Sequence, residues 1–148
     1  MTITVRDAVL GDVSFIHDLV GRLAVFEKLE EHFVATTEQY VDALFGPDAV
    51  AQVLIAEVDG VAAGFTLSFP TFSTFLGRRG VWLEDLFVVE EHRRKGVARA
   101  LLDELTRRTP GRLEWEVLDW NKNAIELYES LGASRTSGWS KYRLTSEP

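Results

Sequence analysis

The stretch from Val81 to Arg108 places the strongest constraint on how this chain can fold. The apolar run 81–89 predicts a strand, and the apolar spacing after Gly96 predicts a helix that ends before Pro110. Amides at the start of a helix point outward, and the helix dipole favours an anion there. Gly96 also lets a ligand approach the backbone closely. The stretch therefore predicts a strand–turn–helix unit that binds phosphate.

The turn is a cluster of positive charges in a chain whose net charge is −7. Its charge alone is explained equally well by a solvent-exposed helix start. The position of the turn, directly after a strand and before an amphipathic helix, favours the phosphate interpretation. The cations of this cluster are Arg93, Arg94, Lys95 and Arg99.

A second motif, Asn-x-x-Ala-x-x-x-Tyr-x-x-x-Gly, begins at Asn121. It predicts a helix from about Lys122 to Leu131, with Asn121 as N-cap and Gly132 as C-terminal cap. The motif places a phenol, Tyr128, on this helix. A phenol with a pKa of about 10 stays protonated at pH 7 and can act as an acid. The alternative is a half-buried aromatic side chain that packs on the sheet.

The rest of the chain predicts one domain over residues 1–148, of class α/β (α+β). The element order βααβββαβαβ indicates a mixed, mostly antiparallel sheet of about six to seven strands, flanked by about four helices. Asp12 is expected to cap the first helix, Thr36 and Gln39 to form a capping box, and Asp59-Gly60 to form a hairpin turn. The named strands are 2–6, 51–58, 61–69, 81–89, 113–118 and 139–144.

Composition excludes several classes of function. The acidic balance argues against nucleic-acid binding, which needs a basic face. No apolar run approaches the roughly 20 residues of a membrane span, so no membrane contact is expected and the cytoplasm is the default location. The chain has no cysteine, which excludes disulfides, thiolate metal sites and a cysteinyl acyl-enzyme. The scattered His17, His32 and His92 lack metal-ligand spacing, and no metal is expected.

Together the two motifs resemble the signatures of the GNAT superfamily of N-acetyltransferases. The first signature, Gln/Arg-x-x-Gly-x-Gly/Ala, is matched by Arg93, Gly96 and Ala98. The second is matched by Asn121, Ala124, Tyr128 and Gly132.

The chain is most similar to the spermidine/spermine (diamine) and thialysine acetyltransferase branch. That branch carries a Leu-Glu-Asp-x-Phe-Val strand, matched from Leu83 to Val88, and a Trp-Asn pair, matched by Trp120 and Asn121. Its segment at the end of the first helix is matched by Ala24, Phe26, Glu27, Glu30 and Glu31.

The resemblance implies that acetyl-CoA is the co-substrate and lies where two parallel strands splay apart. Val88 N–H is then a candidate oxyanion donor for the thioester carbonyl, and Tyr128 the acid that protonates the CoA thiolate. The implied cofactor-binding residues are Leu86, Phe87, Val88, Arg93, Arg94, Lys95, Gly96, Val97, Ala98, Arg99, Asn121, Ala124 and Tyr128.

The amine side is implied to involve Phe26, Glu27, Glu84 and Asp85. Glu84 is the favoured proton acceptor, acting through water. Neighbouring strand residues point to opposite faces, so only Glu84 or Asp85 faces the cleft unless a bulge intervenes. The alternative for these carboxylates is a structural one, in which they cap local backbone N–H groups.

This chain departs from the polyamine-acetylating members at two positions. It has Ser73 and Ser137 about where those members carry acidic residues that hold a distant ammonium group. A long polycation loses its anchors without them, so a short amine or a lysine-like amino acid such as thialysine is favoured.

These observations predict an acetyl-CoA-dependent N-acetyltransferase in which a small primary amine, a diamine, polyamine or lysine-like amino acid, attacks directly within a ternary complex. Acetylation of a protein or peptide amine, and a non-catalytic acyl-CoA-binding module, are the alternatives. The resemblance also implies a homodimer.

Overall fold

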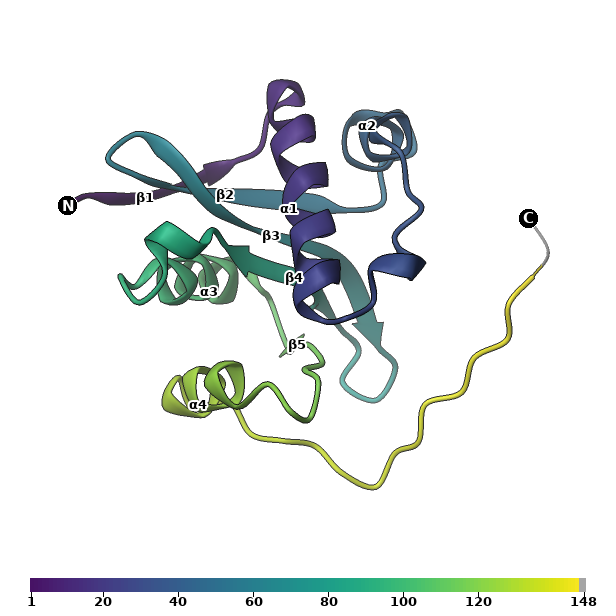
Figure 1. Cartoon of the computed structure of the whole chain (residues 1–148). Helices are drawn as coiled ribbons and strands as arrows, with labels where there is room; N and C mark the ends of the chain where they lie inside the picture. The colour runs from purple at the N-terminus through teal and green to yellow at the C-terminus, as the bar shows by residue number, and fades with distance from the viewer. Residues whose placement is uncertain (147–148) are drawn as a thin grey trace. The chain divides into compact units, whose positions relative to one another are not determined.

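The computed structural model describes residues 1–146, and the chain divides into two compact units, Met1–Glu116 and Val117–Pro148. Figure 1 shows the course of the chain through both. The first unit holds the whole sheet and three of the four α-helices of the described residues. The prediction of one domain over residues 1–148 stays a prediction.

The first unit is built on a five-stranded mixed sheet with the order β1-β2-β3-β4-β5. The first three pairings are antiparallel, and β5 joins β4 in parallel. The strands are β1 Ile3–Asp7, β2 Gln52–Val58, β3 Val61–Ser73, β4 Arg78–Val88 and β5 Leu113–Glu114.

Local sequence explains the turns that connect these elements. Asp59 and Gly60 have φ values of +50° and +83°, the left-handed pair that a two-residue hairpin turn requires, and this prediction is confirmed. The capping box is also confirmed, with Thr36 and Gln39 exchanging hydrogen bonds of 2.9 and 3.2 Å at the start of α2. The helices are α1 Val13–Phe26, α2 Thr37–Phe45, α3 Val97–Arg108 and α4 Lys122–Ser130, with short 3₁₀ turns η1 Leu10–Asp12, η2 Glu30–His32 and η3 Glu90–His92.

Helices α1 and α3 cover opposite faces of the sheet. Arg6 of β1 pairs with Asp12 at the start of α1, whereas its neighbour Asp7 pairs with Arg108 at the end of α3. Since adjacent strand residues point to opposite faces, the two helices lie on different sides. The core between these layers contains fully buried apolar side chains from both helices and from β2 and β3, namely Ile16, Leu19, Ile55, Phe65 and Leu101.

Four predictions about the fold need correction. The sheet has five strands in the described residues, not six to seven. Residues 139–144 form no strand there, and Trp139 and Leu144 are more than nine-tenths exposed. The strand predicted at 113–118 is only two residues long. Asp12 does not cap α1, because its carboxylate accepts hydrogen bonds from Arg6 and from the amide of Val9.

Candidate functional site

One edge of β4 is left open beyond its first residues. Strand β5 pairs with β4 only at Val81 and Trp82, and within the described part of the chain no other strand joins that edge from Leu83 to Val88. Open backbone N–H and C=O groups on an edge can pair with an extended ligand. Leu86, Phe87 and Val88, which are predicted to bind the cofactor, all lie on this open stretch.

The predicted phosphate loop, Arg93 to Arg99, follows β4 after the short turn η3. Arg94 and Gly96 both have positive φ, +60° and +89°, so the backbone turns sharply before α3 begins at Val97. The first helical bond of α3 runs from the Ala100 amide to the Gly96 carbonyl, at 3.0 Å. The amides that precede Ala100 lie at the start of the helix, where an anion is favoured. The loop geometry therefore matches the type of site predicted, and cofactor binding itself stays a prediction.

The side chain of Arg93 turns back onto the protein. Its Nε donates to the Val88 carbonyl at 2.9 Å. Its guanidinium carbon lies 5.1 Å from the ring centroid of Phe87 and 5.8 Å from that of Phe26, the last residue of α1. Arg93 therefore touches both the end of β4 and the end of α1.

A β-bulge in β4 decides where the two adjacent carboxylates point. Leu67 of β3 lies opposite Asp85, and the next residue of β3, Ser68, lies opposite Leu83. Glu84 is thus the extra residue on β4, without a partner of its own in the register. The bulge interrupts the alternation of faces that would otherwise separate Glu84 from Asp85.

Both carboxylates lie on the same face of the sheet. Residues directly opposite each other on paired strands lie on the same face of the sheet. Asp85 therefore lies on the face of Leu67, and Trp82 lies on the face of Phe69. Leu67 and Phe69 are two residues apart and lie on one face. The Trp82 indole N–H donates to Glu84 at 3.0 Å, which places Glu84 on that face as well.

Burial and like charges perturb the ionisation of this face. Burial, with further contributions from Glu84 and Glu27, raises the pKa of Asp85 from 3.8 to about 7. Burial also raises the pKa of Glu27. Glu84 itself is exposed. The half-buried Asp85 can therefore exchange a proton near neutral pH.

Tyr40 is a candidate site residue that sequence reasoning missed. It lies on α2, and burial together with the charges of Asp85 and Glu84 raises the pKa of its phenol to about 12. Its ring packs edge-on against His17 at 5.5 Å, and His17 contacts the Ala35 carbonyl at 2.8 Å. No motif in the sequence marks Tyr40, because its place beside the carboxylates depends on how α2 packs.

The second unit carries the remaining predicted residues. Asn121 caps α4, with its side chain accepting from the Ala124 amide at 3.4 Å, and this structural prediction is confirmed. Gly132 ends the helix with a φ of +89°. Tyr128 is half-buried on α4. The roles of Asn121, Ala124 and Tyr128 toward the cofactor and the thiolate stay predictions.

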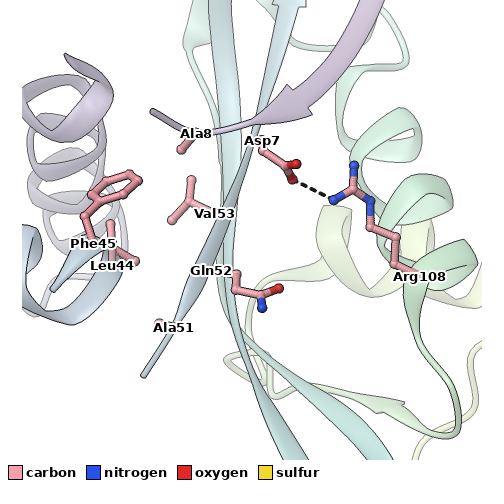
Figure 2. Close-up of a pocket in the computed structure, with 8 residues that line it drawn as sticks. All are labelled: Asp7, Ala8, Leu44, Phe45, Ala51, Gln52, Val53 and Arg108. Carbon is pink, nitrogen blue, oxygen red and sulfur yellow. Dashed lines mark hydrogen bonds and ion pairs between the residues drawn. The ribbon is translucent and has the colours of Figure 1, made fainter. Parts of the chain in front are cut away.

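Elsewhere in the first unit, a pocket of ≈ 390 Å³ contains none of the predicted site residues. In Figure 2, Asp7 points to Arg108, and their ion pair is 2.6 Å long. Within residues 1–146, no helix is long and apolar enough to cross a membrane, and no group of three or more acidic or histidine side chains is placed to hold a metal. The pocket is lined by Asp7, Ala8, Leu44, Phe45, Ala51, Gln52, Val53 and Arg108.

Comparison with known protein families gives a match that covers most of the chain. Residues 16–133 match the model of the Acetyltransferase (GNAT) family. That range includes both motifs, the bulged strand and α4.

Two curated relatives are similar over almost the whole chain. An L-ornithine N5-acetyltransferase of Arabidopsis thaliana is 32% identical, over 97% of this chain and 84% of the relative. A thialysine N-epsilon-acetyltransferase of Caenorhabditis elegans is 35% identical, over 89% of this chain and 82% of the relative.

Among solved structures, an aminoglycoside acetyltransferase from an uncultured soil metagenomic sample has a TM-score of 0.77. It is 20% identical, and the match covers 98% of this chain and 100% of that one. At this identity the likeness concerns the fold alone.

Proposed function

The chain belongs to the GNAT family of N-acetyltransferases, and from that premise we propose that it transfers the acetyl group of acetyl-CoA to the primary amine of a small, lysine-like acceptor. The observation that carries this proposal is the half-buried carboxyl of Asp85, with a pKa raised to about 7, on the part of β4 whose edge is open. Acyl transfer to an amine needs a proton acceptor beside the thioester, and this position provides one.

The cofactor side of the proposal uses mainly backbone groups. Amides of the loop from Arg94 to Arg99 hold the pyrophosphate, and the open edge from Leu86 to Val88 pairs with the pantetheine arm. The positive φ of Gly96 and the exposed cations of the loop support this assignment. The Val88 N–H polarises the thioester carbonyl, which is worth most in the tetrahedral transition state.

We assign the proton-accepting role to Asp85, with Glu84 as its charged neighbour. The sequence favoured Glu84, but Glu84 is exposed, whereas the pKa of Asp85 is raised to about 7, which suits a base that works at neutral pH. Glu84 and Glu27 then attract the cationic acceptor and contribute to the raised pKa of Asp85.

The proposed reaction balances as follows. Asp85 takes one proton from the acceptor ammonium group, and the freed nitrogen lone pair forms a bond to the thioester carbonyl carbon. The C–S bond breaks, and Tyr128 gives its phenol proton to the departing thiolate. The second proton lost by the nitrogen returns to Tyr128 through solvent, and the proton on Asp85 is released to solvent. No acyl-enzyme forms.

Two observations favour a short acceptor over a long polyamine. Ser73, at a position where polyamine-acetylating proteins carry an acidic residue, accepts a hydrogen bond from the Leu76 amide in the turn between β3 and β4. It has no charge with which to hold a distant ammonium group. The curated relatives named above are an ornithine and a thialysine acetyltransferase.

A thioester-consumption assay tests the proposal. Acetyl-CoA is offered with thialysine, L-ornithine, lysine, putrescine, spermidine and short peptides, and the release of CoA thiol is followed. We expect turnover with the amino-acid acceptors to exceed that with spermidine, and intersecting initial-rate lines that indicate a ternary complex. Ping-pong kinetics would exclude direct attack. Turnover of peptides alone, or binding of acetyl-CoA without turnover of any amine, would replace the proposal with one of the two alternatives.

A further inference from the structure

Arg93 of the phosphate loop contacts the body of the first unit. Arg93, Arg94 and Lys95 are all exposed residues. Arg93 nevertheless uses its guanidinium group on three protein partners, the Val88 carbonyl and the rings of Phe87 and Phe26. A planar guanidinium can donate a hydrogen bond in its plane while its face lies against aromatic rings, which an ammonium group cannot do equally well.

Arg93 fixes the last peptide group of β4. The carbonyl of Val88 accepts from Arg93 Nε at 2.9 Å, and the N–H of the same peptide group, that of Val89, donates to the Ala63 carbonyl at 2.8 Å. The peptide is thus held on both sides. The strand end that carries the proposed oxyanion donor and the loop that follows it are positioned together.

The second contact of Arg93 leads to the amine side. Phe26 is the last residue of α1, and Glu27 follows it as the C-terminal cap, donating its amide to the Leu23 carbonyl at 2.9 Å. Glu27 is near enough to Asp85 to contribute to its ionisation. Arg93 therefore contacts Phe26, and the next residue, Glu27, lies near enough to act electrostatically on the carboxyl proposed as proton acceptor.

We propose that Arg93 is a positioning residue that ties the phosphate-binding loop to the amine-binding end of α1, so that occupancy of the loop by CoA orders Phe26 and Glu27 for the acceptor. This inference rests on the proposed function for its two ligands. Its structural part, the tether between loop and helix end, stands on the contacts of Arg93 alone. By reciprocity, an acceptor bound at the end of α1 strengthens CoA binding by the same factor.

Steady-state kinetics separate this role from simple phosphate attraction. Arg93→Lys keeps the positive charge but loses the planar guanidinium group. The matched variant Lys95→Met removes a positive charge and leaves the contacts of Arg93 in place. We expect Arg93→Lys to raise KM for L-ornithine or thialysine by on the order of threefold to tenfold, with a smaller change in KM for acetyl-CoA. Lys95→Met is expected to do the reverse. An Arg93→Lys variant that changes only KM for acetyl-CoA overturns the coupling.

Amide hydrogen exchange tests the tether without turnover. In the free protein, Arg93→Lys is expected to speed exchange of the Glu27, Lys28 and Leu29 amides by about threefold to tenfold, and Lys95→Met to leave it unchanged. Adding CoA, the probe, is expected to slow exchange at these amides in the wild type and to protect only the loop in Arg93→Lys. Unchanged exchange at the end of α1 in the free variant removes the tether. If CoA protects neither segment of the wild type, the proposed function fails, and the free-protein result still decides the tether.

Discussion

The proposed phosphate loop and the acidic face proposed to receive the amine are built in different ways. The loop is one continuous segment of seven residues, Arg93 to Arg99, and its geometry depends on two positive φ values and the start of a helix. The acidic face is assembled from α1, α2 and the bulge of β4, and its chemistry depends on burial. A binding site for a common ligand can be encoded locally, whereas the acceptor side is set by tertiary packing. Substitutions in the two regions should therefore fail in different ways.

The largest effect is expected at Asp85. Asp85→Asn removes the proton acceptor and should lower kcat/KM by on the order of 10²- to 10³-fold. Because the wild-type pKa is raised to about 7, wild-type activity should rise with pH through neutrality, and the variant should lose this step. Rate–pH profiles of the wild type, Asp85→Asn and the matched Glu84→Gln provide the measurement. A profile that loses its step in Glu84→Gln instead would return the role to Glu84.

The same substitution should stabilise the fold at neutral pH. A carboxyl whose folded pKa is raised from 3.8 to about 7 contributes stability that is present below pH 3.8 and lost as the pH rises through 7. Asp85→Asn avoids that loss, so its advantage over the wild type should grow between pH 4 and 7 to about 2–4 kcal/mol. Urea unfolding at pH 4, 5.5 and 7.5 measures it. An advantage that does not change with pH would mean that Asp85 is not held protonated by burial.

Tyr128→Phe tests the acid assigned to the second unit. Loss of a proton donor to the thiolate should lower kcat by about 10- to 100-fold, with KM for acetyl-CoA changed little, because the ring remains. The measurement is kcat with acetyl-CoA and the best acceptor of the panel. Full activity in Tyr128→Phe would end its assignment as acid and leave the second unit with the structural roles of Asn121 and Gly132.

On the cofactor side, Gly96→Ala should act through the backbone. An added Cβ meets only Ile3 Cδ1 at 4.0 Å, so the cost comes from the φ of +89° and not from a clash. Forcing another residue into this conformation costs about 1–2 kcal/mol, and we expect KM for acetyl-CoA to rise about tenfold while KM for the amine stays the same. Gly60→Ala, with a φ of +83° and open space around it, is the matched control. It should lose similar stability and keep both KM values.

The regular elements could be predicted from the sequence because their signals are local. The capping box at Thr36 and the turn at Asp59-Gly60 need only a few neighbouring residues, and both are confirmed. Residues 139–144 have a strand-like pattern, but a strand also needs a partner strand, and these residues form no strand in the described structure. A pattern of side chains shows that a segment favours the strand conformation, but whether it pairs with another strand depends on the rest of the molecule.

The candidate site shows the same division. The turn at Gly96 and the helix that follows could be predicted because their signals are local, and anion binding there stays a prediction. The shared face of Glu84 and Asp85 could not, because the bulge is a property of the register between β3 and β4. Alternation along the strand separates these two residues, and only the extra residue in β4 brings them together.

Tyr40→Phe is the smallest expected effect and the one that best isolates tertiary packing. The phenol lies on α2, beside Asp85 and Glu84, and is neutral below its raised pKa of about 12, so it can only act on them as a dipole or hydrogen-bond donor. Removing the hydroxyl should raise KM for the amine about threefold and leave KM for acetyl-CoA unchanged. His17 packs against the ring and not the hydroxyl, so the melting temperature should stay close to that of the wild type. Equal changes in both KM values would show that α2 supports the whole site, and that the acceptor side is less separate from the cofactor side than the geometry indicates.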